Sequence, residues 1–95
     1  MKIRDLIPGM RRVNINVEVV DVSEPKEVTS RRIKRSIVEA KVKDETGMIT
    51  LVLWDDKIIH DLKAGEKLQV RNGFVSSFKG DMRVNIGEYA EIERT

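Results

Sequence analysis

The feature of this sequence that most constrains its fold is an alternation of apolar and polar residues with a period of two. In residues 13–22, every second position from Val13 to Val19 is Val or Ile, and polar side chains separate them. The same alternation recurs in residues 36–43, 48–54, 66–72 and 81–87. Because successive side chains of a strand point to opposite faces, the pattern predicts five strands that each bury one face.

The segments between these strands differ in length and composition. "DETG" (residues 44–47) predicts a tight hairpin turn between the second and third strands, and "SSFKGD" (residues 76–81) predicts a second hairpin tip. Residues 55–66 are too many for a hairpin and fit a turn of helix followed by a tight turn at Ala64–Gly65. Residues 23–34 form a long, polar and basic link.

Five short strands with a helical excursion between the third and fourth predict a small all-β barrel. A five-stranded Greek-key barrel of the OB-fold type has this order of elements and leaves no long open edge. An SH3-like barrel is the structural alternative. The long third-to-fourth connection, which contains Ile58, Ile59 and Leu62, favours the OB fold. The length of 95 residues predicts one domain over residues 1–95, either complete or one module of a longer protein.

Composition excludes several classes of function. The chain has no cysteine, which excludes disulfides and cysteine-ligated metal sites and indicates an intracellular, cytoplasmic protein. No apolar run approaches the roughly 20 residues needed to span a membrane, and the N-terminus has no apolar signal core. We therefore expect no membrane partner.

The sequence also offers little chemistry for catalysis. His60 is the only histidine and lies in an amphipathic connection, where an exposed or capping role is expected. Asp55 and Asp56 begin the helical link, where acidic residues favour the positive helix end. There is no phosphate-binding glycine loop of the GxxxxGK type. We therefore expect no enzymatic activity, metal ion, cofactor or small-molecule substrate.

Only four residues of the chain are aromatic, and the pattern places at least two of them outside the core. Trp54 lies on the outward face of its strand, unless it caps the end of the barrel. Phe78 adjoins a hairpin tip, where it is either exposed or folded back on its own hairpin. Phe74 is in phase with the core residues, and only a bulge at Asn72–Gly73 would turn it outward. Tyr89 fits either role.

The net charge is only +2, but the basic residues are clustered. Any one cluster could be a solvated loop. Together, however, they belong to the second and third strands and the two long loops, which form one groove in an OB barrel. The candidate phosphate contacts are Arg31, Arg32, Lys34, Arg35, Lys41, Lys43, Arg71, Lys79 and Arg83.

Cations beside exposed rings match the chemistry of a single nucleic-acid strand. Lys and Arg neutralise the phosphates and release counterions. Aromatic rings stack on the exposed bases at roughly 1–3 kcal/mol per base, and they tolerate any base because every base has a flat face. The pattern predicts Phe74 and Phe78 as stacking residues.

The same residues carry a family resemblance. "DETG", "LVLW", "LKAGEKLQVRNGFVSSFKG" and "VNIG", with the opening "IRDLIPGMRRVNINVEVVDV", resemble the OB domains of archaeal single-stranded DNA-binding proteins and archaeal replication protein A. They are also similar to human single-OB relatives. The resemblance implies sequence-tolerant, nucleoid-associated binding of single-stranded DNA in replication, recombination or repair, with other proteins of those processes as candidate partners. The stacking aromatics of the family fall on Trp54, Phe74 and Phe78.

The sequence departs from this family at three points. Phe74 stands where relatives often have Trp or Tyr, and Val84 stands where some have a further aromatic. The chain also lacks the acidic or Gly/Arg-rich tail of many single-OB members, which suggests a module of a longer replication protein.

Two alternative functions remain open. One is an RNA- or tRNA-binding OB domain, because stacking does not sense the 2′-hydroxyl. The other is a protein-interaction OB domain, in which the rings pack against another subunit of a replication complex.

Overall fold

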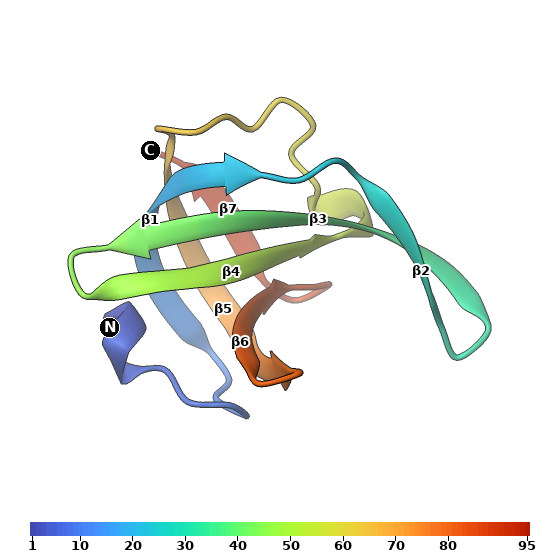
Figure 1. Ribbon diagram of the computed structural model, residues 1–95, viewed down its shortest axis with the longest axis horizontal. Coiled ribbons are helices and arrows are strands. Elements are labelled where there is room, and N and C mark those ends of the chain that lie inside the picture. The colour runs from blue at the N-terminus through green and yellow to red at the C-terminus, as the bar shows by residue number, and fades with distance from the viewer.

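The computed structural model describes residues 1–95, apart from the side chain of Ser30, and shows an all-β architecture (Figure 1). The strands are β1 (Val13–Val22), β2 (Lys26–Ser30), β3 (Ile33–Asp44), β4 (Gly47–Trp54), β5 (Lys67–Phe78), β6 (Asp81–Ile86) and β7 (Glu91–Arg94). Two short 3₁₀ helices span Ile3–Asp5 and Asp55–Lys57.

Five of the strands close into a barrel. They are hydrogen-bonded in the order β1, β3, β4, β6, β5, and β5 returns to pair with β1. The β4–β6 pair is parallel and the other pairs are antiparallel. This topology confirms the predicted OB fold.

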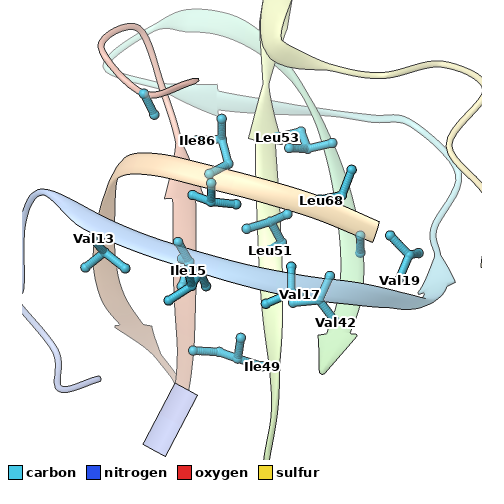
Figure 2. Close-up of a cluster of buried hydrophobic side chains, with 14 of the residues drawn as sticks. Val13, Ile15, Val17, Val19, Val42, Ile49, Leu51, Leu53, Leu68 and Ile86 are labelled. Carbon is cyan, nitrogen blue, oxygen red and sulfur yellow. The ribbon is translucent and has the colours of Figure 1, made fainter. Parts of the chain in front are cut away.

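The core of the barrel is aliphatic. Figure 2 shows inward-facing side chains of β1, among them Ile15 and Val17, gathered with residues such as Leu51, Leu68 and Ile86 of the other barrel strands. Most of these side chains are fully buried. Burial of each large aliphatic side chain stabilises the fold by about 1.5–3 kcal/mol, so the period-two pattern accounts for the barrel.

β2 corrects the prediction of a loop over residues 23–34. β2 pairs antiparallel with the first five residues of β3, and this hairpin projects from the barrel as an arm in Figure 1. We call residues 26–36 the basic arm. Its tip is a two-residue turn at Arg31–Arg32, both with positive φ, of 50° and 67°. A projecting hairpin lacks a core-facing side, so it shows little alternation of apolar and polar residues.

The connection between β4 and β5 contains less helix than expected. Only the three residues Asp55–Lys57 are helical, and turns follow. Leu62 is buried, and Ile58 and Ile59 pack against the core, so the connection covers the barrel as the sequence indicated. Gly65, with φ of +95°, lies in the predicted tight turn.

Candidate nucleic-acid interface

A bulge in β5 turns Phe74 away from the core. Val13 pairs with Gly73 and Ile15 pairs with Val70, so two residue steps on β1 face three on β5. The extra residue is accommodated at Asn72, whose φ is +59°. Beyond it the phase of the strand is reversed: Phe74 is 40% exposed and Val75 is fully buried. The bulge that the sequence allowed at Asn72–Gly73 is thereby confirmed.

Trp54 lies at the end of β4, partly buried, with its ring held by two neighbours. Its indole Nε1 donates a hydrogen bond to Oδ1 of Asn85 at 3.2 Å. The guanidinium of Arg35 lies 4.8 Å from the ring centroid, which is a cation–π geometry. Asn85 in turn donates from Nδ2 to the Phe74 carbonyl oxygen at 3.1 Å. One asparagine of β6 therefore connects the two predicted stacking residues.

Trp54 and Phe74 both line an open cavity of about 660 Å³. Trp54, Phe74 and Arg35 are the predicted site residues that the structure brings together there. The residues that line it are Arg11, Arg12, Arg35, Trp54, Asn72, Gly73, Phe74, Asn85, Gly87, Glu88, Tyr89 and Ala90. We call this the aromatic groove.

Phe78 lies outside the aromatic groove, at the tip of the β5–β6 hairpin. It is 55% exposed and pairs with Asp81 across a two-residue turn, Lys79–Gly80, in which both φ values are positive. The Lys79 ammonium lies 5.4 Å from the Phe78 ring centroid, and the Arg83 guanidinium lies 5.1 Å from it. The expected association of Phe78 with these two cations is therefore present.

Arg83 is nevertheless compensated by an acid. Its Nη1 lies 2.6 Å from Oε2 of Glu39, which faces it from β3 and also pairs with Lys26. The hydrogen bond from Lys26, together with Arg83, holds the pKa of Glu39 below its usual value. The sequence did not reveal this ion-pair network because its members lie on three strands.

Arg71 departs from the expectation that it surrounds the phenylalanines. It precedes the bulge, and its guanidinium bonds to Glu93 at 2.8 Å and to Glu91 at 3.5 Å, both on β7. It does not line the aromatic groove. β7 pairs with the first half of β5, where β6 does not reach, so this strand of acidic residues supplies the partners.

The remaining candidate cations are distributed over two regions. Arg31, Arg32 and Lys34 are exposed on the basic arm, and no ion pair involves them among the described side chains. Lys41 is exposed on β3, and Lys43 lies 3.9 Å from Glu18. The basic arm contains five cations and one anion, a net +4 against +2 for the whole chain.

Arg35 joins the basic arm to the aromatic groove. Its Nε donates to Oδ2 of Asp55 at 2.7 Å, while Oδ1 of Asp55 accepts the Ser36 backbone N–H at 3.0 Å. The backbone hydrogen bond and Arg35 both lower the pKa of Asp55. Asp55 therefore positions the Arg35 guanidinium over the Trp54 ring, which is a structural role for this acid.

Arg11 and Arg12 were not anticipated from the sequence as groove residues, and Tyr89 was left open between the core and the site. Arg11 and Arg12 precede the first strand, and the Arg11 guanidinium lies 5.8 Å from the Phe74 ring centroid. Tyr89, which fitted either role, is 80% exposed beside the cavity. The only available signal was a pair of arginines next to a strand that pairs with β5.

Val84 requires a correction. Its side chain is fully buried, and Asn85 is the β6 residue that faces the groove. The lack of an aromatic side chain at Val84 therefore does not remove a ring from the groove.

Two further classes of site were assessed on the described residues. No group of three or more His, Asp or Glu side chains there is close enough to hold a metal ion. Within the same part of the chain, no helix has the length and apolarity required to cross a membrane.

The family follows from a comparison of the sequence with family models. The model described as "Single-stranded DNA binding protein Ssb-like, OB fold" matches residues 6–94. The chain belongs to this family. Its members are binding proteins and not enzymes, in agreement with the prediction from the sequence.

Individual relatives agree with this assignment. The single-stranded DNA binding protein Ssb of Saccharolobus solfataricus is 35% identical over 91 residues, which cover 96% of this chain and 61% of that protein. The chain thus spans less than two thirds of the length of this relative. A domain of replication protein A from Methanococcus maripaludis superposes with a TM-score of 0.79 at 28% identity, covering 99% of this chain and 92% of the other.

A third similarity concerns the fold alone. The OB domain of Ta0387 from Thermoplasma acidophilum superposes with a TM-score of 0.85 at 21% identity, over 100% of this chain and 85% of the other.

Proposed function

We propose that this chain binds single-stranded DNA largely without sequence preference. The observation that supports this most is the placement of the aromatic residues. The core is built from aliphatic side chains, while Phe74, Phe78 and Tyr89 are exposed and Trp54 is partly buried at the groove. A small protein that keeps every ring out of its core leaves them available for contact with a flat ligand.

The bases stack on Trp54, Phe74 and Phe78. Trp54 and Phe74 line one open cavity, and Phe78 lies four residues further along β5. At about 3.3 Å per residue this separation is about 13 Å, which leaves room for nucleotides between the two rings. Stacking contributes roughly 1–3 kcal/mol per base.

The phosphates contact the surrounding cations. Arg31, Arg32 and Lys34 of the basic arm form no ion pair with a described acid, so they are the strongest candidates. Further contacts come from Arg35, Lys41, Lys43, Lys79 and Arg83. Arg71 is the weakest candidate, because two glutamates already bind it.

The names of the relatives indicate where such binding is used. They include a single-stranded DNA binding protein and a domain of replication protein A. We infer a role in replication, recombination or repair, inside the cell and associated with the nucleoid, with other proteins of these processes as partners. Residues 1–95 act as one OB domain, either alone or within a longer replication protein. RNA is the alternative ligand, since stacking does not distinguish it.

The test uses Trp54, the only tryptophan of the chain, as its own probe. Titration with an oligothymidylate is expected to quench its fluorescence, and the matching duplex is expected to quench it much less. In a second assay, with a labelled oligonucleotide followed by anisotropy, Trp54→Ala should weaken binding by roughly 1–3 kcal/mol.

Val20→Ala is the matched control, because Val20 is an exposed apolar residue of β1 that does not line the groove. An affinity that is unchanged in Trp54→Ala would remove this residue from the site. If neither assay detects binding, a protein-interaction OB domain becomes the better account.

A further inference from the structure

We propose that Tyr89 is a fourth stacking position, which extends the binding site beyond Trp54, Phe74 and Phe78 by at least one nucleotide. This inference rests on the single-strand binding proposed above. Neither the family match nor the sequence pattern assigns a role to this residue. Three features of the described residues support it: the exposure of the ring, the anchoring of its backbone, and the chemistry around it.

The ring of Tyr89 is the most exposed of the four aromatic side chains, at 80%. It protrudes from the short segment that joins β6 to β7. An exposed ring contributes almost nothing to the stability of the fold, so packing does not explain a tyrosine here. A ring this exposed can stack on a base with little displacement of other side chains.

The backbone below the ring is fixed, although the ring itself is free. Nδ2 of Asn72 donates a hydrogen bond to the Tyr89 carbonyl oxygen at 2.9 Å. The Ala90 N–H donates to the Gly87 carbonyl oxygen at 3.1 Å, and the Ala90 side chain is buried in the core. The turn therefore presents Tyr89 at a defined place, which lowers the entropy cost of binding a ligand there.

Asn72 also fixes the distance between Tyr89 and the predicted stacking residues. This asparagine forms the bulge that turns Phe74 outward, two residues along the same strand. Two residues of a strand span about 7 Å. The bulge thus supports Phe74 on one side and the Tyr89 turn on the other. Phe78 and Phe74 follow one another along β5, and the Tyr89 turn lies beside the same strand at Asn72.

The charges near Tyr89 fit the path of a strand. Arg11 and Arg12 line the same groove, and no described acid forms an ion pair with either. Among the described residues, Glu88 is the one acidic side chain that lines the groove. Beyond Tyr89, Glu91 and Glu93 of β7 share Arg71 as a cationic partner, so these three side chains keep a net charge of −1 and do not attract phosphate. The basic part of the surface thus ends near Tyr89, which places it at one end of the bound strand.

The experiment combines two variants with a cross-linking map. Anisotropy is measured with labelled oligothymidylates of increasing length. With oligonucleotides long enough for full affinity, Tyr89→Ala is expected to weaken binding about 5- to 150-fold, the equivalent of losing one stacked base. Tyr89→Phe keeps the ring and is expected to retain the affinity. The Tyr89→Ala variant should reach its maximal affinity at a shorter length than the unmodified protein.

Cross-linking of the unmodified protein gives an independent readout. An oligonucleotide of the shortest length with full affinity carries 5-iododeoxyuridine at one end or the other. Tyr89 is expected to cross-link from one end and Phe78 from the opposite end. The result would also give the polarity of the bound strand.

The outcomes separate this inference from the function on which it rests. If Trp54→Ala weakens binding, while Tyr89→Ala does not at any length and Tyr89 forms no cross-link, the fourth position is overturned and single-strand binding stands. If the unmodified protein binds no oligothymidylate at any length, both proposals fail. Equal losses in Tyr89→Ala and Tyr89→Phe would also overturn the stacking role, because only the hydroxyl would then matter.

Discussion

Asn72 and Gly73 together decide what the middle of β5 presents to solvent. Asn72 adopts the left-handed conformation that the bulge requires, with φ of +59°. Gly73 then lies in the core, where an added Cβ would be 2.9 Å from Cγ1 of Val84 and 3.4 Å from Cγ1 of Val70. Asn72 supplies the change of backbone direction, and Gly73 has no side chain to collide with the core. Phe74 therefore points outward.

This crowding predicts that Gly73→Ala destabilises the protein. The new methyl group would force Val84 or the backbone to move, and overpacking of this kind costs about 1–3 kcal/mol. Urea unfolding followed by circular dichroism measures the effect. Gly87→Ala is the matched control, because nothing lies within 4 Å of its Cβ position. Equal stability of the two variants would show that the core around Val84 adapts freely.

The sequence left the side chain of Phe74 undecided for a physical reason. Alternation alone placed it in phase with Leu68 and Val70, and only the pairing with β1 shows that β5 has one residue more. Arg11 and Arg12 were missed, and Tyr89 was left undecided, because tertiary structure alone brings these residues to the groove. Trp54 was predictable, since its outward phase follows from the aliphatic residues beside it.

At the scale of elements, the basic arm carries the charge while the barrel carries the rings. The arm has a net +4, so the remainder of the chain is at −2. β2 pairs only with β3, and the Arg31–Arg32 turn lies at the far end of this hairpin. Nucleic-acid affinity that depends on the arm would therefore be electrostatic and independent of base identity.

This arrangement predicts the salt dependence of an arm variant. The variant combines Arg31→Gln, Arg32→Gln and Lys34→Gln. In a plot of the logarithm of the binding constant against the logarithm of the salt concentration, its slope should be less steep by about 0.7 for each phosphate that the variant no longer neutralises. The weakening should be similar for thymine, cytosine and adenine oligonucleotides. Binding isotherms at several salt concentrations measure the slope. The fold should persist, because these side chains are exposed.

The matched control removes the same charge elsewhere, with Arg4→Gln, Lys63→Gln and Lys67→Gln. These residues are exposed and do not line the aromatic groove. An equal change of slope in the two triple variants would mean that only net charge matters, and the arm would have no specific role.

The elements themselves were predictable to different degrees. The five barrel strands follow from alternation, because each has one face in the core. β2 and β7 were not predicted, since β2 projects from the barrel and β7 is a four-residue edge with one partly buried residue. The helical connection was overestimated, because Ile58, Ile59 and Leu62 cover the core through turns.

At the scale of the whole molecule, the aliphatic core stabilises the fold, and the rings outside it are available for binding. Stability comes from Val, Ile and Leu side chains within the closed barrel. Removing a ring from the groove therefore leaves the core intact, and binding and stability can be altered separately. Because the core needs no aromatic side chain, all four aromatic residues of the chain are left for the surface.

This division predicts how the protein distinguishes single strands from duplexes. Paired bases are stacked on one another and cannot stack on Trp54 or Phe74, so a duplex retains only the phosphate contacts. Near physiological salt, a single strand should therefore bind about a hundredfold or more tightly than a duplex of the same length. Competition between labelled single strand and unlabelled duplex measures the ratio.

The Trp54→Ala variant decides whether stacking causes the preference. It should lose affinity for the single strand while its affinity for the duplex stays the same. The ratio of single-strand to duplex affinity should therefore decrease. The arm triple variant should bind both the single strand and the duplex more weakly, because both contain phosphates. The ratio of the two affinities should therefore stay nearly constant. If Trp54→Ala lowered both affinities equally, the preference for single strands would have to come from the flexibility of the backbone, and the rings would serve another purpose.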